Sequence, residues 1–144
     1  MKKVLKDKKG KFIVLEGLDG SGKSTQIKIL EKELKKEGFD VKKIDFPQYG
    51  KKSAGLVEEY LVGNYGREKE VSPHIASIFY ACDRYDASKK INKWLKEERV
   101  VISDRYTPSS AGHQGGKIKN KKKRNQFFKW LLHKARYILD SIRP

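Results

Sequence analysis

The sequence has a single cysteine, Cys82, and no hydrophobic run that approaches the length of a membrane span. One thiol cannot form an internal disulfide, which excludes a small disulfide-braced scaffold and fits a reducing compartment. The first ten residues are basic and lack the apolar stretch of a secretion signal. We therefore expect a cytoplasmic protein that does not interact with membranes.

Acidic residues are also scarce. Against 34 Lys and Arg there are 18 Asp and Glu, which gives a formal net charge of +16. Such an excess attracts polyanions such as nucleotides or nucleic acid. Solvated lysines on helix faces and in loops explain the same composition, and composition alone leaves both interpretations open. With 144 residues, 37% of them hydrophobic, the chain suits one domain with its own core.

Apolar runs alternate with helix-like patterns along the chain. The expected strands cover 12–15, 41–46 and 99–103, and the expected helices cover 23–36, 56–61, 73–95 and 127–139. We expect residues 1–10 to form a basic tail, residues 104–119 a loop, and residues 11–144 one domain. Strands that alternate with helices predict an α/β fold with a parallel sheet.

The expected helices carry end signals and apolar faces. Ser72 and Pro73 open the long helix as N-cap and first residue, and Gly38 ends the first helix. Three sets of apolar residues are expected to face the core: Ile27, Ile29, Leu30 and Leu34; Ile75, Ile78, Phe79 and Cys82; and Phe127, Phe128, Leu131, Leu132, Ile138 and Leu139.

The turn after the first strand matches the phosphate-binding pattern G-x-x-x-x-G-K-[ST]. Its glycines let successive backbone N–H groups face one anion, and the following helix N-terminus favours negative charge. Lys23 would contact the β- and γ-phosphates of ATP, and the Ser24 hydroxyl would ligate Mg²⁺. A glycine-rich turn without a ligand is the alternative. The expected nucleotide-binding residues are Gly17, Leu18, Asp19, Gly20, Ser21, Gly22, Lys23, Ser24 and Thr25.

Two further groups of residues indicate a second ligand. Asp104 and Arg105 follow the third strand, at the sheet edge where ligands bind in open parallel sheets. Asp104 could act through Mg²⁺ and Arg105 could hold a phosphate. Tyr80 and Arg84 are four apart on one helix face, where they could stack on a base and donate to its edge. An ordinary ion pair and ordinary surface residues are the alternatives.

Taken in order, these motifs resemble the thymidylate kinase family. The matching segments are the P-loop with Asp19, Phe46-Pro47-Gln48-Tyr49-Gly50, Phe79-Tyr80-Ala81-Cys82-Asp83-Arg84, Asp104-Arg105-Tyr106, Ser109-Ser110 and His113-Gln114-Gly115. The resemblance implies a three-layer P-loop NTPase fold and transfer of a phosphoryl group from ATP to dTMP. It also implies a homodimer packed through helices.

The resemblance also implies roles for single residues. Asp19 would hold the 3′-hydroxyl of dTMP, and the acceptor phosphate would lie against Arg105 and Tyr49. Tyr80 would stack on thymine and Arg84 would donate to its O4, which suits thymine over cytosine because cytosine has a donor there. The remaining expected substrate contacts are Phe46, Pro47, Ser110 and Gln114. The expected catalytic residues are Lys23, Asp104 and Arg105, and the expected metal ligands are Ser24 and Asp104.

This sequence departs from the family pattern in three respects. Gln48 and Tyr49 stand where members often carry an arginine. His113 stands where many bacterial members have an aromatic residue, and we expect it to be a spacer or a polar contact rather than a base. Members are also longer, so we expect a fold truncated after three strands. Without a fourth strand, residues 12–15 would form an exposed apolar edge.

Three functions remain open from the sequence. The first is a dTMP kinase, and the second is a nucleotide-binding fragment without turnover. The third is a basic nucleic-acid-binding protein, suggested by the basic run 117–124. No recognition motif for nucleic acid accompanies that run, and a solvated helix start explains it, so we expect nucleic acid not to be a partner.

Overall fold

The computed structural model describes residues 9–140, with side chains as far as Lys134. Three parallel strands, β1 (Lys11–Leu15), β2 (Val41–Asp45) and β3 (Val100–Asp104), form one sheet in the order β1-β3-β2. Asp104 at the end of β3 is in register with Leu15 on one side and Asp45 on the other. All three strand ends therefore meet at one edge, and the expected α/β fold with a parallel sheet is confirmed.

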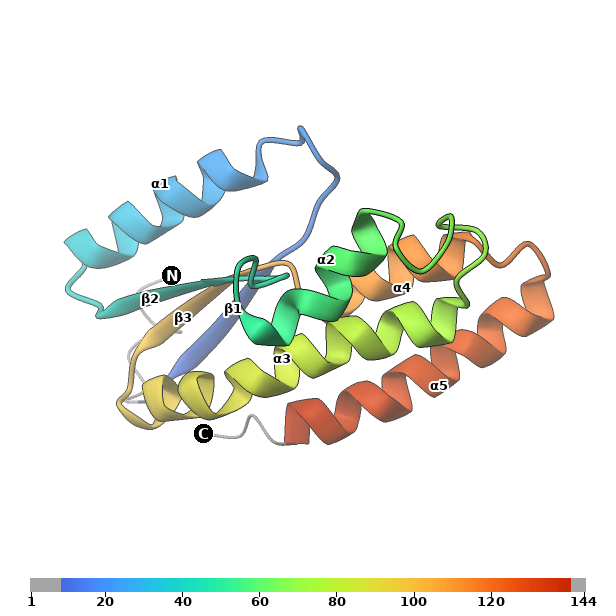
Figure 1. Ribbon diagram of the computed structural model, residues 1–144. Coiled ribbons are helices and arrows are strands. Elements are labelled where there is room, and N and C mark those ends of the chain that lie inside the picture. Colours follow the sequence, from blue (N-terminus) through green and yellow to red (C-terminus); the bar gives the residue numbers. More distant parts are fainter. Residues whose placement is uncertain (1–8, 141–144) are drawn as a thin grey trace.

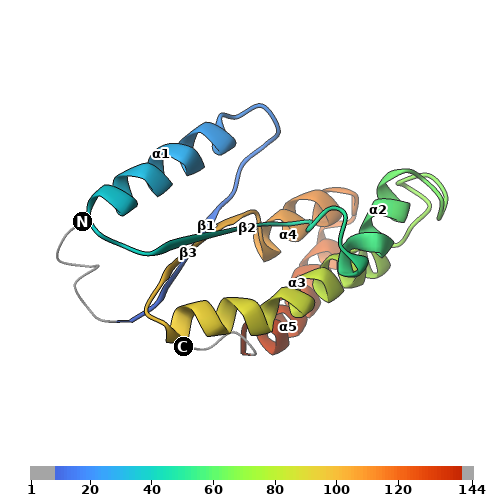
Figure 2. The same ribbon diagram turned by 60° about the vertical axis from the view of Figure 1, so that its left-hand side comes forward.

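Helices cover both faces of this sheet. Helix α1 (Lys23–Lys36) lies on one face and α3 (Pro73–Lys96) on the other, as Figures 1 and 2 show. A 3-10 turn, η1 (Lys52–Ala54), leads into α2 (Gly55–Leu61). Helices α2 and α4 (Thr107–Gly116) lie beyond the carboxyl ends of the strands, and α5 (Lys121–Asp140) packs against α3 and α4 (Figure 1). The described part of the chain thus has the expected three layers.

The ends of the two long helices follow from local sequence. The Ser72 hydroxyl accepts a hydrogen bond from His74 N at 3.3 Å, and Pro73 is the first residue of α3. Gly38 follows the C-cap of α1 with φ +87°, a left-handed conformation that glycine adopts without a steric penalty. These expected start and stop signals are confirmed.

The expected loop at 104–119 is wrong, because most of it is helix α4. Pro108 lies in the first turn, where a missing N–H costs little. Gly115 is buried beneath Phe128 of α5, and a Cβ at Gly115 would lie 2.3 Å from Phe128 Cε1. The glycine that suggests a loop in the sequence therefore permits α4 and α5 to pack closely.

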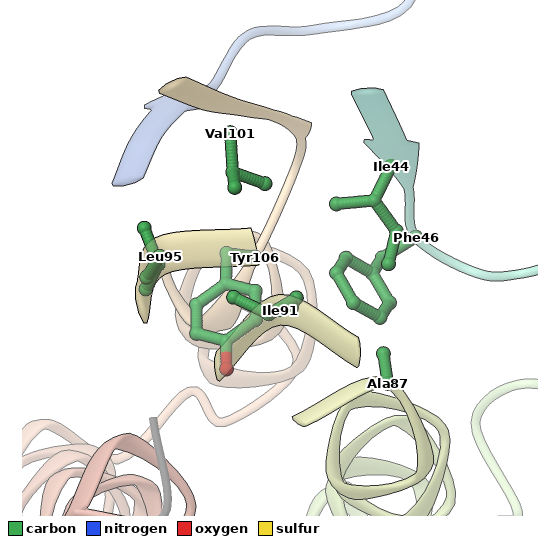
Figure 3. Packing of buried hydrophobic residues seen from close by; sticks show 7 residues of the cluster. All are labelled: Ile44, Phe46, Ala87, Ile91, Leu95, Val101 and Tyr106. Atoms are coloured by element: carbon green, nitrogen blue, oxygen red, sulfur yellow. The ribbon is translucent and has the colours of Figure 1, made fainter. Parts of the chain in front are cut away.

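Figure 3 shows the larger core cluster, between the sheet and α3. The Tyr106 ring packs edge-on against Phe12 and Phe46, with centroid separations of 5.2 and 5.5 Å. A second cluster fills the space beneath α1. The first cluster contains Ile44, Phe46, Ala87, Ile91, Leu95, Val101 and Tyr106, and the second contains Ile27, Leu34, Val41, Val100 and Ile102.

The expected core face of α3 is wrong for three of its four residues. Ile75 is 46% exposed, Ile78 is 44% exposed and Cys82 is exposed, whereas Phe79 is partly buried against Tyr60, Val71 and Ala76. The buried face instead carries small, polar and charged residues over much of its length, because it packs against the other helices and lines a cavity. Its members are Ala76, Ser77, Asp83, Arg84, Ala87, Ser88, Ile91 and Leu95.

Two further core predictions are wrong, and two cannot be judged. Ile29 of α1 and Leu132 of α5 are exposed, whereas Phe127 and Leu131 are buried as expected. The side chains of Ile138 and Leu139 lie outside the described residues, as does the expected tail over 1–8. None of the described helices is long and apolar enough to cross a membrane.

Strand β1 pairs with β3 alone among the described strands, so its other edge is open. Its five residues are half-buried. An apolar groove with a volume of about 990 Å³ lies between β1, α4 and α5. The expected apolar edge at 12–15 is therefore present.

Candidate active site

The turn between β1 and α1 has the backbone conformation of a phosphate loop. Gly20 and Gly22 adopt φ of +76° and +83°, in the left-handed region that favours glycine. Ser21 N donates to Leu18 O at 3.2 Å and closes the turn, and α1 begins directly afterwards at Lys23. The expected P-loop thus joins the strand and the helix as predicted, with its N–H groups at the helix N-terminus.

Lys23 and Asp104, two of the expected catalytic residues, form an ion pair. Lys23 Nζ lies 2.9 Å from Asp104 Oδ1, and the two side chains are 11% and 20% exposed. Because both groups are largely shielded from water, their attraction is stronger than that of a surface pair. The pair joins the P-loop to the carboxyl end of the central strand.

Arg105, the third expected catalytic residue, spans the site from β3. Its Nη2 lies 2.5 Å from Asp19 Oδ1 in the P-loop, and its Nη1 lies 3.4 Å from Ser109 Oγ and 3.3 Å from His113 Nε2. Arg105 has φ +65°, an uncommon conformation for a residue with a side chain. His113, expected to make a polar contact, therefore makes it with Arg105.

A cavity of about 210 Å³ lies beside the P-loop, between α2, α3 and α4. The nine residues expected to contact substrate all line it: Asp19, Phe46, Pro47, Tyr49, Tyr80, Arg84, Arg105, Ser110 and Gln114. Six other residues complete its wall: Tyr60, Leu61, Glu68, Tyr106, Ser109 and His113. Residues far apart in the sequence thus meet in one concave site, as binding sites in such folds do.

Arg84 lies deep in this cavity and is 3% exposed. Its Nη1 donates to Ser110 Oγ at 3.2 Å, and its guanidinium carbon lies 5.6 Å from the centroid of the Tyr106 ring. Burial lowers the pKa of Arg84, while Tyr106 and Asp83 act in the opposite direction. Its Nε has no hydrogen-bond partner among the described residues. A buried donor without a partner is costly to the folded state.

Gln114 on α4 has a buried acceptor without a partner, where Arg84 has a buried donor. It is 2% exposed, and its Nε2 donates to Tyr60 Oη at 3.4 Å. Its Oε1 is buried and has no hydrogen-bond partner within the part of the chain that the structure describes. Arg84 and Gln114, which both line the cavity, thus each keep one enclosed polar atom without a partner among the described residues.

The Phe46-Pro47 wall is held by a buried network that the sequence did not reveal. Asp83 accepts hydrogen bonds from Gln48 N at 2.8 Å, from Gln48 Nε2 at 3.1 Å and from Ser53 Oγ at 2.7 Å. Gln48 is therefore a buried structural residue, whereas Tyr49 is 65% exposed at the cavity rim.

Glu16 and Tyr80 complete the site. Glu16 accepts hydrogen bonds from Tyr106 N at 2.8 Å and from the Ser109 hydroxyl, which ties the start of α4 to the end of β1. Burial raises the pKa of Tyr80 from 10.0 to about 12, further above physiological pH, where tyrosine is already neutral. A neutral aromatic ring in a cavity wall is suited to stacking on a base.

Comparisons with known proteins agree with this geometry. The sequence profile of the family described as thymidylate kinase matches residues 15–129. Thymidylate kinase of Caldanaerobacter subterraneus subsp. tengcongensis is 40% identical over 74% of this chain and 50% of its own length. Thymidylate kinase of Plasmodium falciparum is 34% identical over 77% of this chain and 51% of its own length.

One relative extends the match, and one solved structure has the same fold. A probable thymidylate kinase of Thermococcus gammatolerans is 35% identical over 94% of this chain and 62% of its own length. The structure of thymidylate kinase from Candida albicans superposes with a TM-score of 0.69 at 30% identity, covering 88% of this chain and 57% of that one. The chain spans about half to three-fifths of the length of these relatives. On the profile, the relatives and the shared fold, this chain belongs to the thymidylate kinase family.

Proposed function

We propose that this chain carries the ATP and dTMP sites of a dTMP kinase, which transfers the γ-phosphoryl group of ATP to dTMP and yields ADP and dTDP. The observation that carries the proposal is the cavity beside the P-loop, which is lined by all nine residues expected to contact the substrate. Family membership supports it.

We assign base recognition to two residues that line this cavity, Arg84 and Gln114. Thymine presents the O4 acceptor beside the N3–H donor, so O4 would accept from Arg84 while N3–H would donate to Gln114 Oε1. Cytosine has the opposite order and would place donor against donor at Arg84. Guanine has the same order as thymine but is a larger, bicyclic base. Tyr80 would stack on the ring, and Ser110, Phe46 and Pro47 would complete the enclosure.

The polar groups at the P-loop end of the cavity would bind the phosphates and the sugar. Lys23 and the backbone amides of Gly17 to Thr25 would hold ATP, and Ser24 and Asp104 would hold Mg²⁺. A hydroxyl and a carboxylate are hard oxygen ligands, which fit Mg²⁺ when phosphate oxygens complete its shell. Bound Mg²⁺ supplies charge neutralisation for phosphoryl transfer.

The acceptor side of the proposal uses the bridge between Arg105 and Asp19. Arg105, with Tyr49 at the rim, would hold the phosphate of dTMP, and Asp19 would hold its 3′-hydroxyl. Their contact at 2.5 Å keeps both groups at the same end of the cavity. Catalysis would need no covalent intermediate, because positioning and charge neutralisation are the main contributions to phosphoryl transfer.

Nucleotide binding without turnover is the second candidate for these 144 residues. It is favoured by the fraction of each relative that the chain covers, which is 50% for the Caldanaerobacter enzyme. Nucleic-acid binding has less support, because Lys117, the first residue of the basic run, contacts Tyr60 and Glu68 of the cavity wall.

We further propose a cytoplasmic homodimer. The outward stripe of α3, with Ile75, Ile78, Cys82 and Tyr85, recurs at helical spacing and is suited to pack against the same stripe of a second copy. The single cysteine favours a reducing compartment.

The test is a panel of acceptors measured by calorimetry and by ADP release with Mg-ATP. The acceptors are dTMP, dUMP, dCMP and dGMP. We expect dTMP to bind best, dUMP to follow because it has the same edge, and dCMP to bind at least tenfold more weakly than dTMP. Binding with ADP release supports the kinase, and binding without it supports the second candidate. Equal binding of dCMP and dTMP would contradict the proposed base recognition.

A further inference from the structure

We propose that His113 is a phosphate-binding residue that takes up a proton when the acceptor nucleotide binds; the inference rests on the proposed function. His113 lies on α4 and lines the cavity beside Arg105, the residue proposed to hold the phosphate of dTMP. Its side chain is exposed, so the ring can exchange protons with solvent. The contact with Arg105 gives His113 a larger role than the polar contact expected from the sequence.

The contact with Arg105 defines the protonation state of His113. His113 Nε2 lies 3.3 Å from Arg105 Nη1. A guanidinium nitrogen can only donate a hydrogen bond, so at this contact Nε2 must accept. Nε2 accepts only in the neutral imidazole whose hydrogen is on Nδ1. His113 is therefore neutral while it contacts Arg105, because a protonated ring would place two cations side by side.

The charges that line the cavity balance without His113. They are two carboxylates and two guanidinium groups, on Asp19, Glu68, Arg84 and Arg105. Each carboxylate has a cationic partner: Asp19 lies 2.5 Å from Arg105, and Glu68 lies 2.9 Å from Lys117. Hydrogen bonding and charge from Lys117 lower the pKa of the Glu68 carboxyl, which is therefore ionised at neutral pH. A neutral His113 thus leaves the cavity lining without net charge.

The side chains around His113 do not compete with it for a proton near neutral pH. Histidine ordinarily titrates there, whereas Asp, Glu, Tyr, Lys and Arg titrate outside the range from about 7 to 8.5. The titratable groups on the segments around His113 are Glu16, Asp19, Tyr49, Tyr60, Glu68, Tyr80, Arg84, Arg105, Tyr106 and Lys117. Among the described residues of the cavity wall, His113 is thus the group that can gain positive charge when an anion binds.

A bound phosphate would change the partner of Arg105. The phosphate of a nucleotide is largely a dianion at pH 7.5, because its second pKa is about 6. Its oxygens would accept from Arg105 Nη1 in place of His113, since an anion is a stronger acceptor than a neutral imidazole. Nε2 would then face an anion, bind a proton from solvent and donate to the phosphate. Two nitrogens 3.3 Å apart can both donate to one phosphate group.

Calorimetry at pH 7.5, in buffers of different ionisation enthalpy, measures the protons taken up on binding. We expect the wild-type chain to take up about half a proton or more per dTMP, and none with thymidine, which lacks the phosphate. His113→Gln keeps an acceptor for Arg105 but cannot be protonated, so it should bind dTMP more weakly and without proton uptake. His74→Gln, which replaces a histidine outside the cavity, is the matched control and should behave like the wild type.

The pH dependence of dTMP affinity gives a second readout. Because binding takes up a proton, affinity should fall about tenfold between pH 7 and 8.5 in the wild type, and less than about twofold in His113→Gln. His113→Lys carries a cation throughout this range and should bind dTMP more tightly than His113→Gln, without proton uptake. Proton uptake that persists in His113→Gln, or wild-type binding of dTMP without uptake, would overturn the inference. A wild-type chain that binds no dTMP would instead refute the proposed function.

Discussion

Lys23 Nζ and Asp104 Oδ1 lie 2.9 Å apart, so the lysine of the P-loop faces the carboxylate that ends the central strand. Without a nucleotide, each group neutralises the other in a partly shielded position. When Mg-ATP binds, Lys23 would pair instead with a phosphate oxygen, and Asp104 would pair with Mg²⁺. Under the proposed function, each of the two groups would have an oppositely charged partner both with and without the nucleotide.

Replacing Lys23 tests the phosphate site. We expect Lys23→Met to lower the affinity for Mg-ATP by more than tenfold, because the ammonium is lost and Asp104 then repels the phosphates. Calorimetry measures the change. Lys28→Met, an exposed residue one turn further along α1, serves as the control and should bind normally. Equal affinity of both variants would remove Lys23 from the site.

Replacing Arg84 tests the base site. We expect Arg84→Ala to weaken dTMP binding more than tenfold and to leave Mg-ATP binding within twofold. The reason is that a buried acceptor on the base would lose its donor. Lys89→Ala, exposed on the same helix, is the matched control. Unchanged dTMP affinity in the Arg84 variant would show that the base lies elsewhere.

Replacing Asp83 tests the buried network behind the Phe46-Pro47 wall. In Asp83→Asn an amide NH₂ would face donors from Gln48 or Ser53, so at least one hydrogen bond would be lost. We expect the free energy of unfolding to fall by about 1–3 kcal/mol. Urea denaturation measures it, with Asp86→Asn, exposed on the same helix, as control. A loss no larger than that of the control would argue against the network.

Tyr106 gives a prediction for alkaline pH. Its hydroxyl is buried without a hydrogen-bond partner among the described residues, and burial raises its pKa from 10.0 to about 12. Between these values the unfolded chain loses a proton that the folded chain keeps, so the free energy of unfolding falls as pH rises from 10 to 12.

Tyr106→Phe removes that titration. We expect the variant to be as stable as the wild type at pH 7, because no hydrogen bond is lost, and to lose less stability between pH 10 and 11.5. Thermal unfolding followed by circular dichroism across this range gives the comparison. Tyr85→Phe, exposed on α3, should behave like the wild type. If wild type and Tyr106→Phe lost the same stability between pH 10 and 11.5, the raised pKa of Tyr106 would be contradicted.

The outward stripe of α3 gives a prediction for assembly. If two copies pack through it, Ile78→Glu would bury a carboxylate against apolar side chains and the dimer would dissociate. Sedimentation velocity should show a dimer for the wild type and a monomer for Ile78→Glu. Lys93→Glu, which also changes charge on an exposed position of α3, should remain dimeric. A wild-type monomer at high micromolar concentration would refute the dimer.

Local signals predicted much of the fold. Continuous apolar runs identified β1 and β3, and Ser72, Pro73 and Gly38 marked helix ends within a residue or two. The P-loop was recognisable because its chemistry depends on adjacent residues. These features share one property, namely that their cause lies within a few positions along the chain.

Features that depend on contacts between distant segments were missed. Helix α4 depends on close packing of Gly115 against Phe128, and the buried face of α3 depends on the cavity that Asp83 and Arg84 support. Lys117 resembled its solvated neighbours in the basic run until its partners Tyr60 and Glu68 were located. No local pattern distinguishes such residues from surface residues of the same type.

The contact between Gly115 and Phe128 links the base site to a helix that never touches it. Gly115 directly follows Gln114, and the Phe128 ring leaves no room for even a methyl group at that position. A displacement of α5 toward α4 would therefore press on the backbone next to Gln114. A segment or partner that bound the far side of α5 would thereby act on one wall of the cavity.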